Sequence, residues 1–130
     1  MAKRDTPVIL VIEDYPDTRD LLSSLLRTKG YKVVEACDGK EGLRQATRIK
    51  PDLILMDLAL PALDGVEATR QIRERNKLSE TPIFAISSFA TAEVARDALA
   101  AGCTEVFRKP IDIEPFLGKI RATLNDFGVR

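Results

Sequence analysis

The chain has 130 residues, a length that is typical of one domain and sufficient to bury a hydrophobic core. Its 20 basic and 20 acidic residues give a formal net charge of zero, which does not favour binding to nucleic acid or to an anionic membrane. The apolar runs have the length of strands rather than membrane spans, and the first begins near the N-terminus. We therefore expect a cytoplasmic protein without a signal peptide.

The first apolar pattern is an aliphatic run at residues 8–12, which Glu13 and Asp14 follow directly. A continuous run of this kind is typical of a strand that is buried on both faces, as in parallel sheets covered by helices. Leucines then recur at helical spacing over residues 17–28 and predict an amphipathic helix with Asp17 as its cap.

A second strand is expected over residues 32–36. The second helix is predicted to begin after Asp38, a capping residue, and to end before Pro51. The third strand is another aliphatic run, and it ends at Asp57. A turn follows, after which Asp64 is expected to cap a third helix that extends to about residue 75.

The remaining elements follow the same alternation. A fourth strand is predicted over residues 83–86, a fourth helix over residues 91–101 and a fifth strand over residues 105–109. Pro115 suits the first turn of a last helix, because the first turn of a helix does not need its N–H groups.

Five alternating strands and helices predict an α/β fold, the flavodoxin-like (βα)5 doubly wound parallel sheet with strand order 2-1-3-4-5. We expect one domain over residues 1–130, with its core between about residues 8 and 124. The three aliphatic strands belong in the middle of the sheet. The first and third strands are then neighbours, and the winding direction switches between them, which is where ligands bind in such sheets.

The residue types limit the chemistry. The chain has no histidine, which excludes imidazole as a base, a phosphate carrier or a metal ligand. Its two cysteines, Cys37 and Cys103, are too few for a disulfide framework or a zinc site, and we expect both to be buried. Any chemistry must therefore use carboxylates, hydroxyls and lysine.

Polar side chains stand at the ends of four predicted strands: Glu13 and Asp14, Asp57, Ser87 and Lys109. The carboxyl ends of parallel strands share one edge, so these groups should meet. Two carboxylates about 4 Å apart repel by roughly 4 kcal/mol at an effective dielectric constant near 20. A trio of them implies a bound cation, a protonated member, or side chains that do not meet.

This set resembles the receiver domain of bacterial two-component response regulators, in the stand-alone form typical of chemotaxis regulators. The resemblance covers residues 8–124, and four segments in order at strand ends are highly specific. These segments are Val11-Ile12-Glu13-Asp14, residues 56–65 (MDLALPALDG), Ile86-Ser87 and Arg108-Lys109-Pro110.

The resemblance implies that Asp57 accepts a phosphoryl group from a phosphohistidine on a histidine kinase or a histidine phosphotransfer protein. A carboxylate can attack phosphorus in this way. It also implies Mg²⁺, with Mn²⁺ as an alternative ion, held by Asp14, Asp57 and the backbone carbonyl of Ala59, with Glu13 acting mostly through water. Such a protein is not an enzyme in the usual sense, since it catalyses only its own phosphorylation and slow dephosphorylation.

By the same resemblance, Lys109 pairs with a phosphoryl oxygen, and Pro110 follows a cis peptide bond that aims this lysine inward. Ser87 moves to donate a hydrogen bond to the phosphate. That movement shifts a protein-binding surface on the fourth helix, the fifth strand and the fifth helix. An unidentified target protein binds this surface. The protein could remain a monomer or form a dimer on phosphorylation.

Two departures from the family pattern lead to further expectations. The switch position that is aromatic in many receivers is Val106, and Phe107 beside it should project to the opposite face of the strand. We therefore expect no aromatic switch, and either weaker coupling or coupling through the loop after Ser87 alone. The positions that tune hydrolysis are Ala59 and Phe89, and neither can orient an attacking water, so self-dephosphorylation should be slow.

Other classes of protein share parts of this pattern. A flavin-binding module has the same fold, but the loop at residues 14–18 is acidic and lacks a phosphate cradle. A phosphatase of the haloacid dehalogenase type needs a second aspartate two residues after the nucleophile, where this chain has Ala59. A GTPase is excluded because no P-loop motif is present. The serious alternative is an unphosphorylated, receiver-like protein-interaction module.

Overall fold

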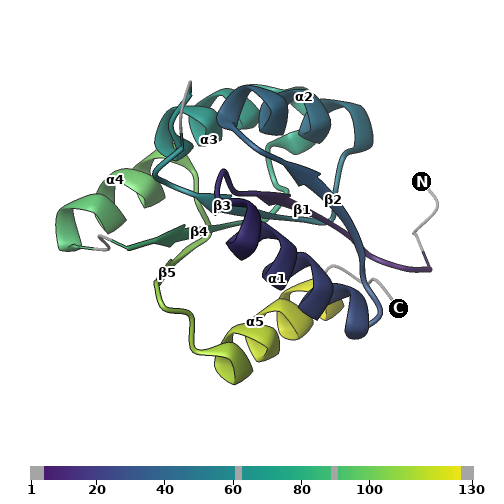
Figure 1. The fold of residues 1–130 in the computed structure, drawn as a ribbon. Helices are drawn as coiled ribbons and strands as arrows, with labels where there is room; N and C mark the ends of the chain where they lie inside the picture. Colours follow the sequence, from purple (N-terminus) through teal and green to yellow (C-terminus); the bar gives the residue numbers. More distant parts are fainter. Residues whose placement is uncertain (1–4, 61–62, 89–90, 127–130) are drawn as a thin grey trace.

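The structure, a computed structural model, describes residues 5–60, 63–88 and 91–126 (Figure 1). The elements in chain order are β1 (Val8–Ile12), α1 (Pro16–Thr28), β2 (Lys32–Ala36), α2 (Gly39–Ile49), β3 (Leu53–Asp57), α3 (Gly65–Arg73), the short 3₁₀ helix η1 (Asn76–Leu78), β4 (Ile83–Ser87), α4 (Ala92–Ala101), β5 (Glu105–Arg108) and α5 (Ile113–Asp126). None of the described helices combines the length and apolar character that a bilayer span requires.

The strands form one parallel sheet in the order β2-β1-β3-β4-β5, which confirms the predicted flavodoxin-like α/β fold. Figure 1 shows α1 and α5 on one face of the sheet and α2, α3 and α4 on the other. The three central strands are aliphatic because helices cover both of their faces. As predicted, β1 and β3 are neighbours, so the winding direction switches between them.

Two hydrophobic clusters lie on the two faces of the sheet. Under α1 and α5, Phe107 packs against Phe84 and Phe116, with ring centroids 5.2 and 4.9 Å apart. Val106 packs instead against the cluster under α2, α3 and α4. The predicted opposite directions of these two neighbours in β5 are therefore confirmed, as the alternation of side chains along a strand requires.

The helix ends agree with the predicted caps in two cases and differ in one. The carboxylates of Asp38 and Asp64 accept hydrogen bonds from the N–H groups of Glu41 and Glu67. At α4, for which no cap was predicted, the Thr91 hydroxyl accepts a hydrogen bond from the N–H of Val94. The prediction that Asp17 caps α1 is wrong. That helix begins one residue earlier because proline suits its first position, and Tyr15 precedes it without a side-chain cap.

The two cysteines differ in exposure. Cys103 is buried as expected, but Cys37 is exposed, so that prediction is wrong. Cys37 follows the last residue of β2, where the chain has already left the core, and its N–H donates a hydrogen bond to the carboxylate of Glu41. Its thiol has a raised pKa, chiefly because of its hydrogen bond with Glu41.

Two glycines allow a matched test of packing. A side chain on Gly39, the first residue of α2, would overlap the carbonyl oxygen of Leu63, whereas nothing lies within 4 Å of the corresponding position at Gly118 in α5. Gly39→Ala should lower the free energy of unfolding by about 2 kcal/mol. Gly118→Ala should raise it by about 0.5 to 1 kcal/mol, because alanine favours a helix interior. Urea unfolding followed by circular dichroism measures both, and equal effects would contradict this packing.

Candidate active site at the carboxyl edge of the sheet

The polar residues that the sequence predicts at the strand ends all lie at the same edge of the sheet. Glu13 and Asp14 follow β1, Asp57 and Ser87 are the last residues of β3 and β4, and Lys109 follows β5. Ligand oxygens of the three carboxylates lie within 4.8 Å of one another. The Lys109 ammonium is 3.1 Å from Glu13 Oε1 and 3.6 Å from Asp57 Oδ2.

Glu13 is buried, and each of its polar atoms forms a hydrogen bond with another group of the protein. Its Oε1 accepts a hydrogen bond from Lys109, and its Oε2 accepts one from the N–H of Tyr15 at 3.1 Å. Its carbonyl oxygen accepts from Arg19 Nη1 at 2.9 Å, and its N–H donates to the carbonyl of Ala36 at 3.0 Å. With both carboxylate oxygens already engaged, Glu13 is placed to orient Lys109 and the loop after β1.

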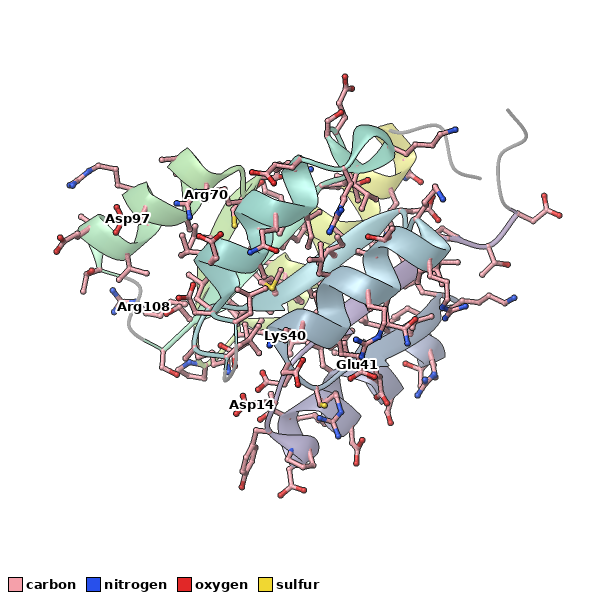
Figure 2. All side chains as sticks on the ribbon, turned by 90° about the horizontal axis from the view of Figure 1, so that it is seen from above. Asp14, Lys40, Glu41, Arg70, Asp97 and Arg108 are labelled. Atoms are coloured by element: carbon pink, nitrogen blue, oxygen red, sulfur yellow. The ribbon has the colours of Figure 1, made fainter. Side chains whose placement is uncertain are left out.

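Asp14 differs from Glu13, since its side chain is exposed and faces solvent at the opening of the site. Figure 2 shows Asp14 at the border of the molecule, on the same side as Lys40 and Glu41 in the first turn of α2. An exposed carboxylate next to two buried ones can bind an ion that enters from water.

Asp57 is only 5% exposed. Burial is the main reason that its pKa rises to about 6 from 3.8; the N–H of Ala59, which donates to Oδ1 at 3.0 Å, opposes this rise, and the charge of Glu13 adds to it. For Lys109, burial lowers the pKa, but the charges of Asp57 and Glu13 outweigh burial and raise it overall. The site therefore holds excess negative charge in a partly dehydrated setting.

The donor set fits a hard divalent cation. Three carboxylates and one ammonium leave an excess of two negative charges when all four are ionised. Magnesium prefers oxygen ligands and keeps several of its waters, so one exposed and one buried carboxylate with few further donors suffice. The N–H of Ala59 already contacts Asp57, which places this residue beside the carboxylates.

The other predicted site residues have these positions. The Lys109–Pro110 peptide bond is cis, as expected. Ser87 is buried, and its carbonyl oxygen accepts a hydrogen bond from the N–H of Lys109 at 2.9 Å, so the ends of β4 and β5 are joined. Val106 is half-buried and packs against the hydrophobic cluster under α2, α3 and α4. Phe89 lies outside the described residues.

Sequence reasoning missed Arg19. Its guanidinium donates to the carbonyl oxygen of Glu13 and so supports the loop that carries Asp14. The residue lies in the first turns of α1, directly after the acidic pair. A basic residue about one helical turn beyond an acidic strand end is the signal that could have indicated this contact, because the start of α1 must face the end of β1.

A parallel five-stranded sheet with a carboxylate trio and a lysine at its switch point defines the class of protein, a flavodoxin-like domain with an acidic site. A family model described as the response regulator receiver domain matches residues 9–121. The chain therefore belongs to the receiver domain family of two-component signalling.

Individual relatives agree with this assignment. The chain is 30% identical over 118 residues to the polar-differentiation response regulator DivK of Brucella anthropi, a match that covers 91% of this chain and 96% of DivK. It is 33% identical over 118 residues to the DNA-binding dual master transcriptional regulator RpaA of Synechocystis, covering 91% of this chain but only 49% of RpaA.

Solved structures show the same fold. The receiver domain of the sensor histidine kinase PA1611 of Pseudomonas aeruginosa is 32% identical with a TM-score of 0.86, and the match covers 92% of this chain and 98% of that domain; it was crystallised with a magnesium ion coordinated in its active site cleft. The chemotaxis protein CheY4 of Vibrio cholerae is 27% identical with a TM-score of 0.86, and the match covers 91% and 98% of the two chains.

Proposed function

We propose that this domain accepts a phosphoryl group on Asp57 from a phosphohistidine of a partner kinase or phosphotransfer protein, in a Mg²⁺-dependent reaction. The observation that carries the proposal is a group of three carboxylates whose oxygens lie within 4.8 Å of one another, beside an ammonium group. A cluster with this charge is costly unless it binds a cation, and the cation together with the ammonium group can then stabilise phosphoryl oxygens. The domain is proposed to comprise the core between about residues 8 and 124.

In the proposed reaction a carboxylate oxygen of Asp57 attacks phosphorus, and the bond between phosphorus and the imidazole nitrogen of the donor breaks. The electron pair stays on that nitrogen, and the acyl phosphate remains on Asp57. Because the Ala59 N–H holds Oδ1, the carboxylate keeps a fixed orientation. Lys109 is placed to pair with a phosphoryl oxygen, since its ammonium lies 3.6 Å from Oδ2.

Asp14, Asp57 and the Ala59 carbonyl would hold Mg²⁺, with Glu13 acting through water, and the ion would neutralise the charge of the carboxylates and the phosphoryl group. The solved PA1611 receiver, which holds magnesium in its cleft, supports this assignment. The engagement of both Glu13 carboxylate oxygens by protein donors favours its indirect role.

The proposed output is a change in a protein-binding surface formed by α4, β5 and α5. Ser87 is buried at the end of β4, beside the strand that carries Asp57. Its hydroxyl could therefore turn towards a phosphate on Asp57 and donate a hydrogen bond to it. Contacts that exist only in the phosphorylated state shift a two-state population. Because Val106 offers no ring, we propose that the signal passes from Ser87 to α4 through the loop.

Acetyl phosphate with Mg²⁺ tests the proposal without knowledge of the kinase. We expect one base-labile phosphoryl group per chain, mapped to Asp57 by mass spectrometry, and no labelling when EDTA removes the metal. If the chain remains unlabelled at saturating donor and metal, the phosphorylation proposal fails and the alternative, an unphosphorylated interaction module, is favoured.

The phosphate on Asp57 should be long-lived. Ala59 is exposed beside the phosphoacceptor, and its methyl group cannot orient an attacking water. Ala59→Asn supplies an amide that can, and should shorten the half-life of the phosphate by at least about tenfold. Decay of the labelled mass after removal of the donor measures this, with Ala59→Val as the matched control. A wild-type half-life of only seconds would refute the prediction.

A further inference from the structure

Helix α4 is attached to the rest of the molecule mainly at its C-terminal end. Its buried residues, Ala98 and Ala101, both lie in the second half of the helix. In the first half, Glu93 and Arg96 are exposed and Val94 is only half-buried. Within the part of the chain that the structure describes, the anchoring contacts of α4 are thus concentrated at one end.

Arg73, the last residue of α3, holds that end. Its Nε and Nη2 donate to the carbonyl oxygen of Gly102 at 3.0 and 2.8 Å, and its Nη1 donates to the carbonyl oxygen of Leu78 at 2.7 Å. The guanidinium is half-buried, and burial lowers its pKa. One planar side chain thereby ties together α3, η1 and the residue that follows α4.

Gly102, whose carbonyl oxygen accepts the hydrogen bonds from Arg73, occupies a position that favours glycine. Gly102 has a φ of +120°, which favours glycine, and a Cβ there would lie 2.7 Å from Cγ of Arg73. The next residues are held as well. Cys103 Sγ lies 3.4 Å from Thr69 Oγ1 of α3, and Thr104 Oγ1 accepts a hydrogen bond from the N–H of Ile83 in β4.

Helix α4 also borders open space on the side that faces α3. A groove of about 570 Å³ lies between α3 and α4; Val94, Asp97 and Ala100 line one wall, and its floor reaches Ala59 and Ser87 at the ends of β3 and β4. Figure 2 shows α3, which carries Arg70, beside α4, which carries Asp97. Of these wall residues only Val94 belongs to the first half of α4, but that half has no buried residue, so it has room to move next to the candidate active site.

We infer that Arg73 is a positioning residue: it fixes the C-terminal end of α4, so that changes near Ser87 turn the N-terminal half of the helix about this point. A cation on a carbonyl after a helix also stabilises the helix dipole. That effect falls off within the last turn and depends only on the positive charge, so a lysine at residue 73 would retain it.

Hydrogen exchange of backbone amides in the unphosphorylated chain tests the inference. In Arg73→Gln, amides of residues 98–104 should exchange about tenfold faster, because charge-assisted hydrogen bonds to two carbonyls are lost. Amides of β1 and β3 should keep their wild-type rates. Arg70→Gln is the matched control, since Arg70 lies on the same helix, is exposed, and pairs with Glu67; it should leave residues 98–104 unchanged.

Arg73→Lys separates position from charge. An ammonium group can reach one carbonyl but cannot donate in fork geometry to two, so exchange at residues 98–104 should be intermediate. This variant also supplies the comparison if Arg73→Gln does not fold. The inference is overturned if residues 98–104 exchange at the wild-type rate in both variants, or if the amides of the central strands accelerate equally.

The consequence for signalling rests on the proposed function. With acetyl phosphate and Mg²⁺, exchange in the wild-type chain should change in residues 92–97 and remain constant in residues 98–104, whereas in Arg73→Gln the change should spread over all of α4. If Asp57 is not labelled at all, the proposed function fails. The exchange pattern in the unlabelled protein still decides the role of Arg73.

Discussion

Replacing Asp57 by asparagine is expected to abolish covalent labelling by acetyl phosphate and Mg²⁺. The amide nitrogen and oxygen of asparagine are poor nucleophiles towards phosphorus, and no histidine is present to substitute. Intact-mass measurement of wild type and variant after equal exposure to the donor gives the result directly. We expect one added phosphoryl group in the wild type and none in the variant.

The matched control is Asp64→Asn. Asp64 is an exposed carboxylate in the loop that follows β3, and it accepts a hydrogen bond from the N–H of Glu67 as the cap of α3. Asparagine caps helices about as well as aspartate, so this variant should fold and retain its label. Labelling of Asp57→Asn at the wild-type level would show that another residue is the acceptor.

The second large effect concerns stability. In the folded protein the carboxyl of Asp57 titrates near 6, while in the unfolded chain it titrates near 3.8. Below 3.8 the group is protonated in both states and has no effect on stability. As pH rises the unfolded state ionises first, so the free energy of unfolding falls, and above about 6 the full penalty, of the order of 2 to 3 kcal/mol, is present.

Asp57→Asn lacks this penalty. In EDTA, the variant should be more stable than the wild type at about pH 7.5, and the difference should shrink towards zero at about pH 4. Urea unfolding followed by circular dichroism at the two pH values measures it. Addition of Mg²⁺ at the higher pH should stabilise only the wild type appreciably. Parallel pH profiles for the two proteins would contradict the raised pKa.

Much of the fold and the site could be predicted because they depend on patterns along single segments. The aliphatic runs at β1, β3 and β4 indicate strands that helices cover on both faces, and this order of elements leaves few topologies. In a parallel sheet all carboxyl ends share an edge. The polar residues at the strand ends, Glu13, Asp57 and Lys109, therefore had to meet.

Other features could not be read from such patterns. The exposure of Cys37 depends on where β2 leaves the core, and the start of α1 depends on Pro16 rather than on the expected aspartate cap. The support of the acidic loop by Arg19 joins a side chain to a carbonyl oxygen. Carbonyl oxygens are identical in every residue, so the sequence could place Arg19 near the end of β1 but could not tell which carbonyl oxygen its guanidinium contacts.

By itself, the order of residues determined the strand and helix sequence, the sheet topology and the identity of the charged groups at its carboxyl edge, because local periodicity and strand direction suffice for these. Only the tertiary structure decided that both oxygens of Glu13 are engaged, that Asp57 is buried enough to raise its pKa, and that Arg73 contacts Gly102. These properties depend on distances and dehydration between segments far apart in the chain, which packing alone sets.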